Sequence, residues 1–197
     1  MRDKYGISQD IYCYSGTDVL INLLNIRDVE VLEEAEIAFT TERYLSYQGD
    51  KSDISQFNFS HLKFLHLYLF QDVYEWAGKI RKVDISEGNT RFCTFSRIEP
   101  EAIKLFNNIP QLADHTHLTD LVKDLANLFC ELNLLHPFRE GNGRTLRFFF
   151  EEMLFVLGYE ITWPTISQND WIDANIAGVY LDLEPLIAIF TSAVQPR

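Results

Sequence analysis

The sequence predicts an all-α protein with one small β-hairpin. Apolar residues recur at helical spacing over most of the chain, and the segment 119–135 carries leucine, valine and phenylalanine on one face. One stretch changes period, with two short β-prone runs around Ser86-Glu87-Gly88-Asn89, a composition typical of a hairpin turn. With 197 residues, 47% of them hydrophobic and 14% aromatic, the chain is long enough for one well-packed domain.

Two helices are expected near the N-terminus and a third before residue 80. The segments are 17–24 (TDVLINLL) and 28–45, the second with Asp28 as a possible N-cap. A polar loop follows from about 49 to 58. Apolar residues then recur at helical spacing from Ser60, and the glycine at 78 predicts the end of that helix.

The rest of the chain is expected to form the hairpin and then helices again. The two strands are predicted at 80–85 and 91–95. Further helices are expected at about 99–108, 119–135, 144–157 and 170–194. Pro137 ends the longest of them, because the residue before a proline avoids the helical region.

Charge and cysteine content restrict the partners and the compartment. The net charge of −12 argues against direct binding to nucleic acid or to an anionic membrane, since both attract a basic face. The first ten residues contain no apolar core of a signal peptide, and no apolar run approaches the length of a membrane span. Three widely spaced cysteines predict reduced thiols and a cytoplasmic protein.

The stretch HPFREGNGRTLR, residues 136–147, concentrates chemistry between two predicted helices. A glycine-rich turn at a helix N-terminus is an anion cradle, because its N–H groups lack intrahelical partners and the helix dipole is positive there. Gly141 and Gly143 allow close backbone approach, and Asn142 can add donors. Arg144 and Arg147 lie on one side of the first turn and suit a polyphosphate.

The two remaining polar residues complete a nucleotide site. Glu140 fits beside phosphates if Mg²⁺ lies between them, since Mg²⁺ binds through one or two carboxylates plus phosphate oxygens. His136 can act as a general base for an incoming hydroxyl. Together these residues predict a phosphoryl or nucleotidyl transferase. Taken singly, each residue has a plainer role, with His136-Pro137 as a helix stop and the arginines as surface residues.

The same stretch matches the signature of the Fic family, HPFx[D/E]GNGRxxR, at every specified position. LFQDVYEWAGKIRKVDI, residues 69–85, resembles the family segment that leads into its hairpin flap. The N-terminal DKYG…DIYCYSG…LLNI region resembles short, stand-alone bacterial Fic toxins. The resemblance implies the Fic fold, a helical bundle with a β-hairpin flap. It covers nearly the whole chain, as one domain over 1–197 with a core at about 60–160 and the flap at about 79–97.

The resemblance implies AMPylation, the transfer of AMP from ATP to a hydroxyl side chain of a target protein. When the roles of the family motif are assigned to the matching residues here, His136 deprotonates the hydroxyl and Glu140 holds Mg²⁺ against the phosphates. The anion hole is formed by Gly141, Asn142 and Gly143. Arg144 supports the phosphates, and Arg147 binds the γ-phosphate. Phe138 anchors the loop in the core, and the flap offers an open strand edge to the target.

Two further features concern the reaction and its control. Doc-type kinases of this superfamily have lysine where this chain has Gly143, which favours nucleotidyl transfer here. The family's inhibitory motif, [S/T]xxxE[G/N], is absent, because neither Glu87-Gly88 nor Glu140-Gly141 is preceded by Ser or Thr four residues before the glutamate. This implies a small helical antitoxin that inhibits in trans through Arg147. In related toxins the targets are type II topoisomerase subunits, modified on a tyrosine.

Three alternatives to AMP transfer remain open: another nucleotide such as UTP, transfer of a phosphoryl group, and a non-catalytic nucleotide-binding regulator. Among other residues, His115 and His117 are expected at the surface, and His61 and His66 are expected to be structural. The indoles at 163 and 171 are expected in the core, with one of them as a candidate wall of the adenine pocket.

Overall fold

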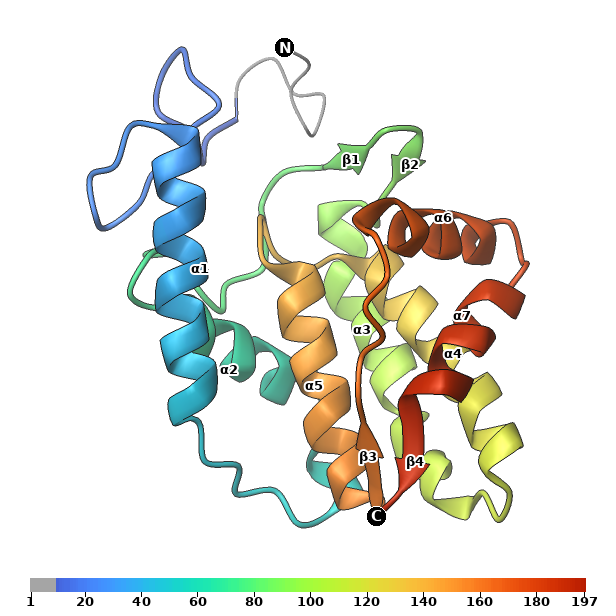
Figure 1. Ribbon diagram of the computed structural model, residues 1–197. Helices are drawn as coiled ribbons and strands as arrows, with labels where there is room; N and C mark the ends of the chain where they lie inside the picture. Colours follow the sequence, from blue (N-terminus) through green and yellow to red (C-terminus); the bar gives the residue numbers. More distant parts are fainter. Residues whose placement is uncertain (1–9) are drawn as a thin grey trace.

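The computed structural model describes residues 10–197 (Figure 1). Residues 1–9, on which the signal-peptide expectation and the DKYG resemblance largely rest, lie outside the described part. The described part contains seven α-helices: α1 (Val29–Ser46), α2 (Phe59–Phe70), α3 (Ile98–Phe106), α4 (Leu118–Leu135), α5 (Asn142–Val156), α6 (Gln168–Val179) and α7 (Glu184–Ala193). It also has two antiparallel strand pairs: β1 (Ser86–Glu87) with β2 (Thr90–Arg91), and β3 (Tyr159–Ile161) with β4 (Val194–Pro196). The predicted all-α class with a small hairpin is confirmed.

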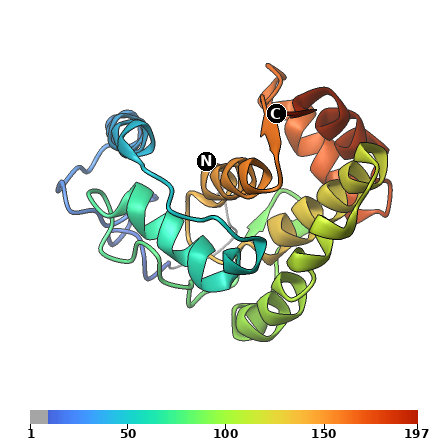
Figure 2. The same ribbon diagram turned by 90° about the horizontal axis from the view of Figure 1, so that it is seen from below.

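Helix α5 lies in the middle of the bundle. Helices α2 and α4 both pack against it, and Figure 2 shows α1 and α2 to one side and α4, α6 and α7 to the other. One face of the helix enters the core, where Phe149, Phe150 and Met153 are each 0% exposed. The loop of residues 136–141 precedes this helix directly, so its position is set by a helix that is anchored in the core.

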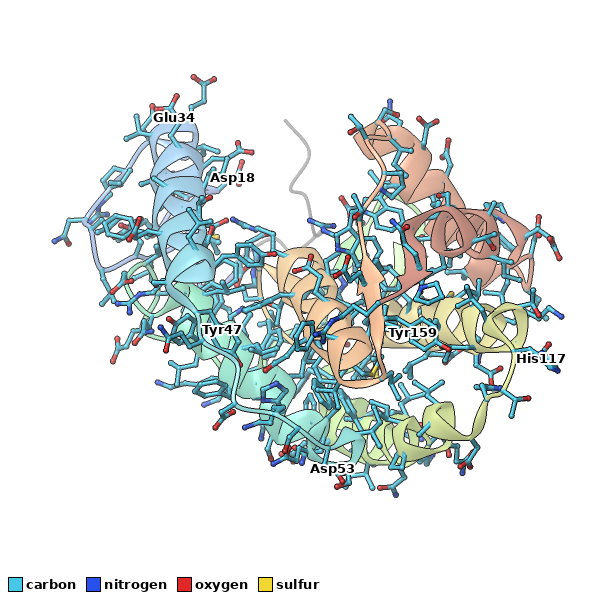
Figure 3. The ribbon with its side chains drawn as sticks, turned by 60° about the horizontal axis from the view of Figure 1, so that its bottom comes forward. Asp18, Glu34, Tyr47, Asp53, His117 and Tyr159 are labelled. Carbon is cyan, nitrogen blue, oxygen red and sulfur yellow. The ribbon has the colours of Figure 1, made fainter. Side chains whose placement is uncertain are left out.

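Helix α1 is tied to α5 by polar and aromatic side chains. The carboxylate of Asp28 caps α1 by accepting from the backbone N–H of Val31 at 3.0 Å, as the sequence predicts. Tyr47, labelled in Figure 3, follows the last turn and donates its hydroxyl to Glu152 of α5 at 2.9 Å. Its ring meets Phe148 edge to face, with centroids 4.8 Å apart.

The helix predicted at 17–24 is wrong. This segment folds back on residues 12–14, with an isolated bridge between Cys13 and Leu20. The side chain of Asn22 supplies the reason, because it donates to the carbonyls of Leu20 at 2.9 Å and Ile26 at 2.8 Å. Side-chain bonds of this local kind stabilise a turn in competition with a helix.

The flap hairpin is present but its paired part is shorter than predicted, and 80–85 forms no strand. The carbonyls of Val83 and Cys93 accept hydrogen bonds from the side chain of Arg81, and do not pair across the hairpin. Only residues 86–87 and 90–91 form strands, around a turn at Gly88 with φ 57°. The helix predicted to reach Gly78 likewise ends at Phe70, and tight turns fill the interval.

The predicted helical tail at 170–194 is divided into α6 and α7 by a turn at Leu181. The turn is a Schellman motif, in which Leu181 N–H donates to Gly178 at 2.9 Å and Asp182 N–H to Ala177 at 3.0 Å. Leu181 takes the left-handed position, φ 68°, that usually carries glycine, and its side chain is 92% exposed. The backbone of Leu181 is therefore strained, and its side chain gains almost no stabilisation from burial.

Replacing Leu181 with glycine should therefore stabilise the protein. Relief of the left-handed conformation outweighs the extra freedom of glycine in the unfolded chain, for a net gain of about 0.5–1 kcal/mol. Urea unfolding followed by circular dichroism measures the change. Leu181→Ala is the matched control, since it removes the same exposed side chain and keeps the strain. An equal gain in both variants would contradict the strain explanation.

Residues 10–197 include no helix with both the length and the apolar character needed to cross a bilayer.

Candidate active site

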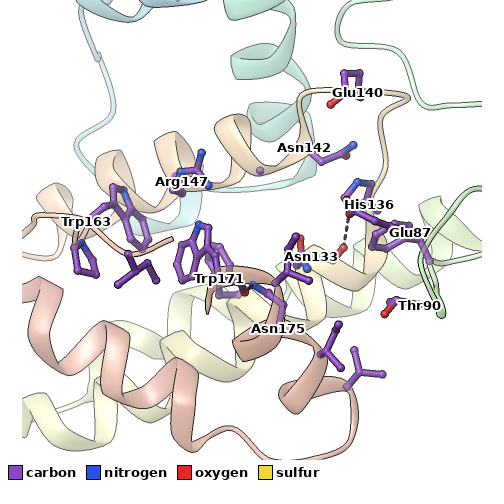
Figure 4. Close-up of a pocket in the computed structure, with 18 residues that line it drawn as sticks. Glu87, Thr90, Asn133, His136, Glu140, Asn142, Arg147, Trp163, Trp171 and Asn175 are labelled. Atoms are coloured by element: carbon purple, nitrogen blue, oxygen red, sulfur yellow. Dashed lines mark hydrogen bonds between the residues drawn. The ribbon is translucent and has the colours of Figure 1, made fainter. Parts of the chain in front are cut away.

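A cavity of about 560 Å³ opens between the flap, the end of α4, the start of α5 and helix α6 (Figure 4). Cavities of this size hold small ligands. Five of the seven residues predicted for the site line it: His136, Glu140, Asn142, Gly143 and Arg147. A second cavity, about 870 Å³, lies beside the segment 46–68 and contains no residue of the motif.

His136 ends α4 and begins the motif loop. It is the C-cap residue, with φ 42° and ψ 62° in the left-handed region. Its Nδ1 lies 3.0 Å from the carbonyl oxygen of Asn133, the dashed line in Figure 4. A carbonyl can only accept, so Nδ1 carries the proton of the neutral ring and Nε2 carries the lone pair. Phe92 of the flap stacks on the ring, with centroids 3.8 Å apart. The histidine is thus held in one tautomer and one orientation.

The loop after His136 is fixed by its own side chains. Asn142 reaches back over four residues, accepting from Phe138 N–H at 2.9 Å and donating to the Phe138 carbonyl at 2.9 Å. Phe138 is 1% exposed, which confirms it as the core anchor of the loop. Gly141 has φ 78°, and a Cβ there would lie 2.2 Å from Phe70. The side-chain amide of Asn142 therefore braces the loop, and the predicted part of its backbone N–H in an anion hole stays a prediction.

Asn142 and Gly143, in the first turn of α5, line the cavity. The first intrahelical bond is Thr145 N–H to Gly141 at 3.1 Å, so the preceding N–H groups of the first turn have no acceptor within the helix. Gly143 adds no side chain, and a Cβ there would lie 3.6 Å from Nη1 of Arg147. Burial lowers the pKa of the Arg147 guanidinium, and the Arg144 cation lowers it further. A helix N-terminus beside an arginine is an arrangement that favours anions.

Arg144 does not line the cavity. Its guanidinium turns towards α1, where it pairs with the carboxylate of Glu36 and lies 3.3 Å from the hydroxyl of Thr40. Glu36 is 6% exposed and also accepts from the hydroxyl of Tyr74, whose pKa is raised by burial and by this carboxylate. The network ties the start of α5 to α1. The expected contact of Arg144 with phosphates remains a prediction.

Glu140 is the candidate metal ligand. Glu140 is one of the residues that line the cavity, and its Oε1 accepts from Gly141 N–H at 3.1 Å. Within residues 10–197 no group of three or more histidine, cysteine or carboxylate side chains could hold a metal ion. One carboxylate suits Mg²⁺, which binds proteins through one or two carboxylates and completes its shell with phosphate oxygens and water. The donor set therefore fits Mg²⁺ together with a nucleotide, and does not fit a metal held by protein alone.

Comparison with known proteins agrees with this geometry. A model of the Fic/DOC family matches residues 56–154. The chain is 38% identical to the "Probable protein adenylyltransferase Fic" of Escherichia coli K12, over 99% of this chain and 97% of that protein. The chain belongs to the Fic/DOC family. It is also 41% identical to the protein adenylyltransferase VbhT of Bartonella schoenbuchensis, over 90% of this chain and 37% of VbhT.

Solved structures share the Fic fold. BepC of Bartonella tribocorum, crystallised with AMPPNP, superposes with a TM-score of 0.86 at 23% identity, covering 94% of this chain and 97% of BepC. A Fic domain from Bartonella quintana with bound ADP gives a TM-score of 0.84 at 24% identity, covering 94% of this chain and 95% of that one. At these identities the likeness concerns the fold.

Several residues of this Fic site are not evident from the sequence. Phe92 and the carbonyl of Asn133 orient His136, yet neither belongs to a motif. Trp163 and Trp171 pack against the core, as expected, and both also line the cavity, with ring centroids 5.8 Å apart. Their only sequence signal is two indoles flanking Pro164.

The other histidines take the structural roles expected of them. His115 pairs with Asp124 at 2.8 Å, and His117, labelled in Figure 3, is exposed and does not line the cavity. His61 is buried against Glu152 at 2.6 Å. His66 is 0% exposed, and its Nε2 lies 3.0 Å from the Glu140 carbonyl, so it supports the motif loop.

His66 should make the stability of this Fic domain depend on pH. Its Nδ1 accepts from Gly78 N–H at 2.8 Å, which requires the neutral ring. Burial lowers its pKa from 6.5 to about 3, so the unfolded chain takes up the proton first. The contribution of neutral His66 to the free energy of unfolding is complete above pH 6.5. Below pH 6.5 it falls by about 1.4 kcal/mol per pH unit.

Urea unfolding between pH 7.5 and pH 5 measures this loss, because most carboxylates stay ionised in that window. We expect the His66→Gln variant to be less stable at pH 7.5 but to show a flatter pH dependence. Equal slopes in the two proteins would contradict the assignment to His66.

Proposed function

We propose that the chain is a protein adenylyltransferase, which transfers AMP from ATP to a hydroxyl side chain of a target protein. One observation carries this proposal. His136, oriented through its Nδ1, shares a cavity with the N-terminus of α5 and with Arg147 in a Fic-family chain. A base beside an anion cradle is what attack of a hydroxyl on a phosphate requires.

The chain's own groups perform each part of the transfer. Nε2 of His136 takes the proton from the target hydroxyl as its oxygen bonds to the α-phosphorus. The bond from the α-phosphorus to the bridging oxygen breaks, and pyrophosphate leaves with that electron pair. The N–H groups in the first turn of α5 stabilise the charge on the phosphates. Arg147 binds the terminal phosphate as a bidentate donor.

Glu140 would hold Mg²⁺ against the phosphates. The bound ion would neutralise charge on the pyrophosphate as it leaves. The protein contributes a carboxylate whose orientation is fixed by the N–H of Gly141.

The far end of the cavity supports adenine as the base. Trp163 and Trp171 offer aromatic faces there, at the opposite end from His136 (Figure 4). Asn175 donates from Nδ2 to the Trp171 carbonyl at 2.8 Å, while its buried Oδ1 has no hydrogen-bond partner in residues 10–197.

The flap is the proposed docking edge for the target, which would add a strand to β1–β2. Resemblance to stand-alone Fic toxins supports ATPase subunits of type II topoisomerases as targets, modified on a tyrosine. We place the reaction in the cytoplasm, which supplies ATP and suits the three free cysteines.

Labelled nucleotide tests the reaction. The purified chain is incubated with Mg²⁺, cell lysate or topoisomerase subunits, and ATP labelled at either the α- or the γ-phosphate. We expect a labelled protein band from the α position alone. Label from the γ position alone would show a kinase, and label from UTP but not ATP another donor. No label from any nucleotide would leave a non-catalytic binding module.

Control by a small helical antitoxin is proposed together with this activity. The chain lacks the family's inhibitory motif, and Arg147 lies half-buried in the cavity, where a partner's glutamate would exclude the γ-phosphate. The purified chain should be active alone and should lose activity when such a partner is added. A chain that is inactive alone and becomes active when an internal segment is deleted would overturn the proposal.

A further inference from the structure

Arg81 is a buried arginine that the proposed chemistry does not use. Its side chain is 0% exposed, and Asp84, the nearest carboxylate with which it forms an ion pair, is 4.0 Å away and 39% exposed. Burial of a charge is costly unless hydrogen bonds compensate for it. The guanidinium of Arg81 instead donates to backbone carbonyls, from Nε to His136 at 2.7 Å, from Nη1 to Val83 at 2.6 Å and from Nη2 to Cys93.

The three carbonyls belong to two functional segments. Val83 and Cys93 lie on the two arms at the base of the flap, and His136 belongs to the motif loop. Two backbone bonds strengthen the same junction, Arg81 N–H to Pro137 and Cys93 N–H to Leu134, each at 2.9 Å. The side chain of Arg81 therefore joins both arms of the flap to the loop that carries the base.

His136 needs such support on its backbone and on its ring. Its left-handed conformation costs a residue other than glycine about 1–2 kcal/mol, and the bond from Arg81 Nε holds its carbonyl in place. Its ring lies against Phe92, which is buried in a small flap cluster with Ile85. Both contacts that orient the histidine from this side come from the flap segment.

We infer that Arg81 is a positioning residue, which holds the flap and His136 in a fixed relation so that a hydroxyl docked on the flap meets the base. This inference rests on the proposed function. Arginine suits the task because its planar fork reaches three acceptors in fixed directions, whereas lysine concentrates its donors at one atom. Burial lowers the pKa of Arg81 to about 10, so the guanidinium remains charged at neutral pH.

The effect on catalysis separates positioning from simple stabilisation. We expect Arg81→Lys to lower kcat for AMP transfer about 10- to 100-fold, because small displacements of a reacting group have effects of this size. The KM for ATP should change less than about 2-fold, since Arg81 does not line the cavity. Phe92→Leu should lower kcat to a similar degree. The decrease in kcat of the double variant should be smaller than the product of the two single decreases, because both residues act through His136.

Arg43→Met is the matched control. Arg43 makes two hydrogen bonds to Asp72, at 2.6 and 2.7 Å, away from the cavity. Its loss should lower stability and leave kcat unchanged. If Arg81→Lys lowers stability as Arg43→Met does, with an unchanged kcat for the folded enzyme, Arg81 is merely structural and the inference is overturned.

A spectroscopic readout keeps the test independent of the proposed function. Stacking on Phe92 displaces the ring proton resonances of His136, which are assigned by their loss in His136→Ala. Phe92→Leu should remove the displacement, and Arg81→Lys should reduce it, whether or not any target is modified. Unchanged His136 resonances in a folded Arg81→Lys variant would overturn the positioning role. Absence of transfer by the wild-type enzyme would instead count against the proposed function alone.

Discussion

Replacement of His136 by alanine is expected to lower AMP transfer about 10³-fold while nucleotide still binds. Removal of a general base has an effect of this order. The chain positions His136 for that role, because the Asn133 carbonyl fixes the proton on Nδ1 and leaves the lone pair on Nε2. The anion cradle of α5 and Arg147 do not depend on the imidazole, so affinity for ATP should remain.

Two measurements test this expectation. Trp163 and Trp171 line the cavity, so their fluorescence reports nucleotide binding in wild type and variant alike. His115→Ala is the matched control, because that histidine pairs with Asp124 away from the site. It should keep full activity. Retained transfer in His136→Ala would show that another group accepts the proton, and lost nucleotide binding would show that the imidazole serves the fold instead.

Replacement of Glu140 by glutamine is expected to lower transfer about 10²-fold and to raise the Mg²⁺ concentration needed for half-maximal activity. A metal ion contributes several kcal/mol of charge stabilisation in the transition state, and each 1.36 kcal/mol changes the rate about tenfold. Glutamine keeps an oxygen for the Gly141 N–H, so the loop should retain its shape. The loss of activity in Glu140→Gln therefore measures the contribution of the negative charge of Glu140.

A magnesium titration of kcat measures the effect. Glu87→Gln is the matched control, because Glu87 is a second carboxylate that lines the same cavity, from the flap. That variant should leave the magnesium dependence unchanged and act, if at all, on the KM for the target. Identical magnesium curves for Glu140→Gln and wild type would contradict the metal assignment.

The elements that local patterns predict well are those buried along one face. Helix α4 was predicted at 119–135 and spans Leu118–Leu135, because its apolar residues meet the core at every turn. The motif loop was placed correctly for a similar reason, since glycine and proline at fixed offsets define a turn between two such helices. The cavity accordingly contains His136, Glu140 and Arg147, as the spacing predicts.

The errors arise where one side chain redirects the backbone. Asn22 converts an apolar run into a turn, and Arg81 removes the carbonyls of the flap base from strand pairing. A side chain also decides where Arg144 lies, because Glu36 on α1 pairs with it away from the cavity that Arg147 lines, and its contact with phosphates stays a prediction. The Asn22 bonds are local and the Glu36–Arg144 pair joins distant segments, but neither kind of contact leaves a mark on the spacing of apolar residues.

The pairing of Glu36 with Arg144 also has a consequence for where this protein can be cut. The segment matched by the family model begins at residue 56, whereas the carboxylate that neutralises Arg144 comes from α1, twenty residues earlier. A fragment that begins at 56 would leave Arg144 and the hydroxyl of Tyr74 without that partner. The smallest cooperative folding unit is therefore longer than the family signature, and α1 belongs inside it.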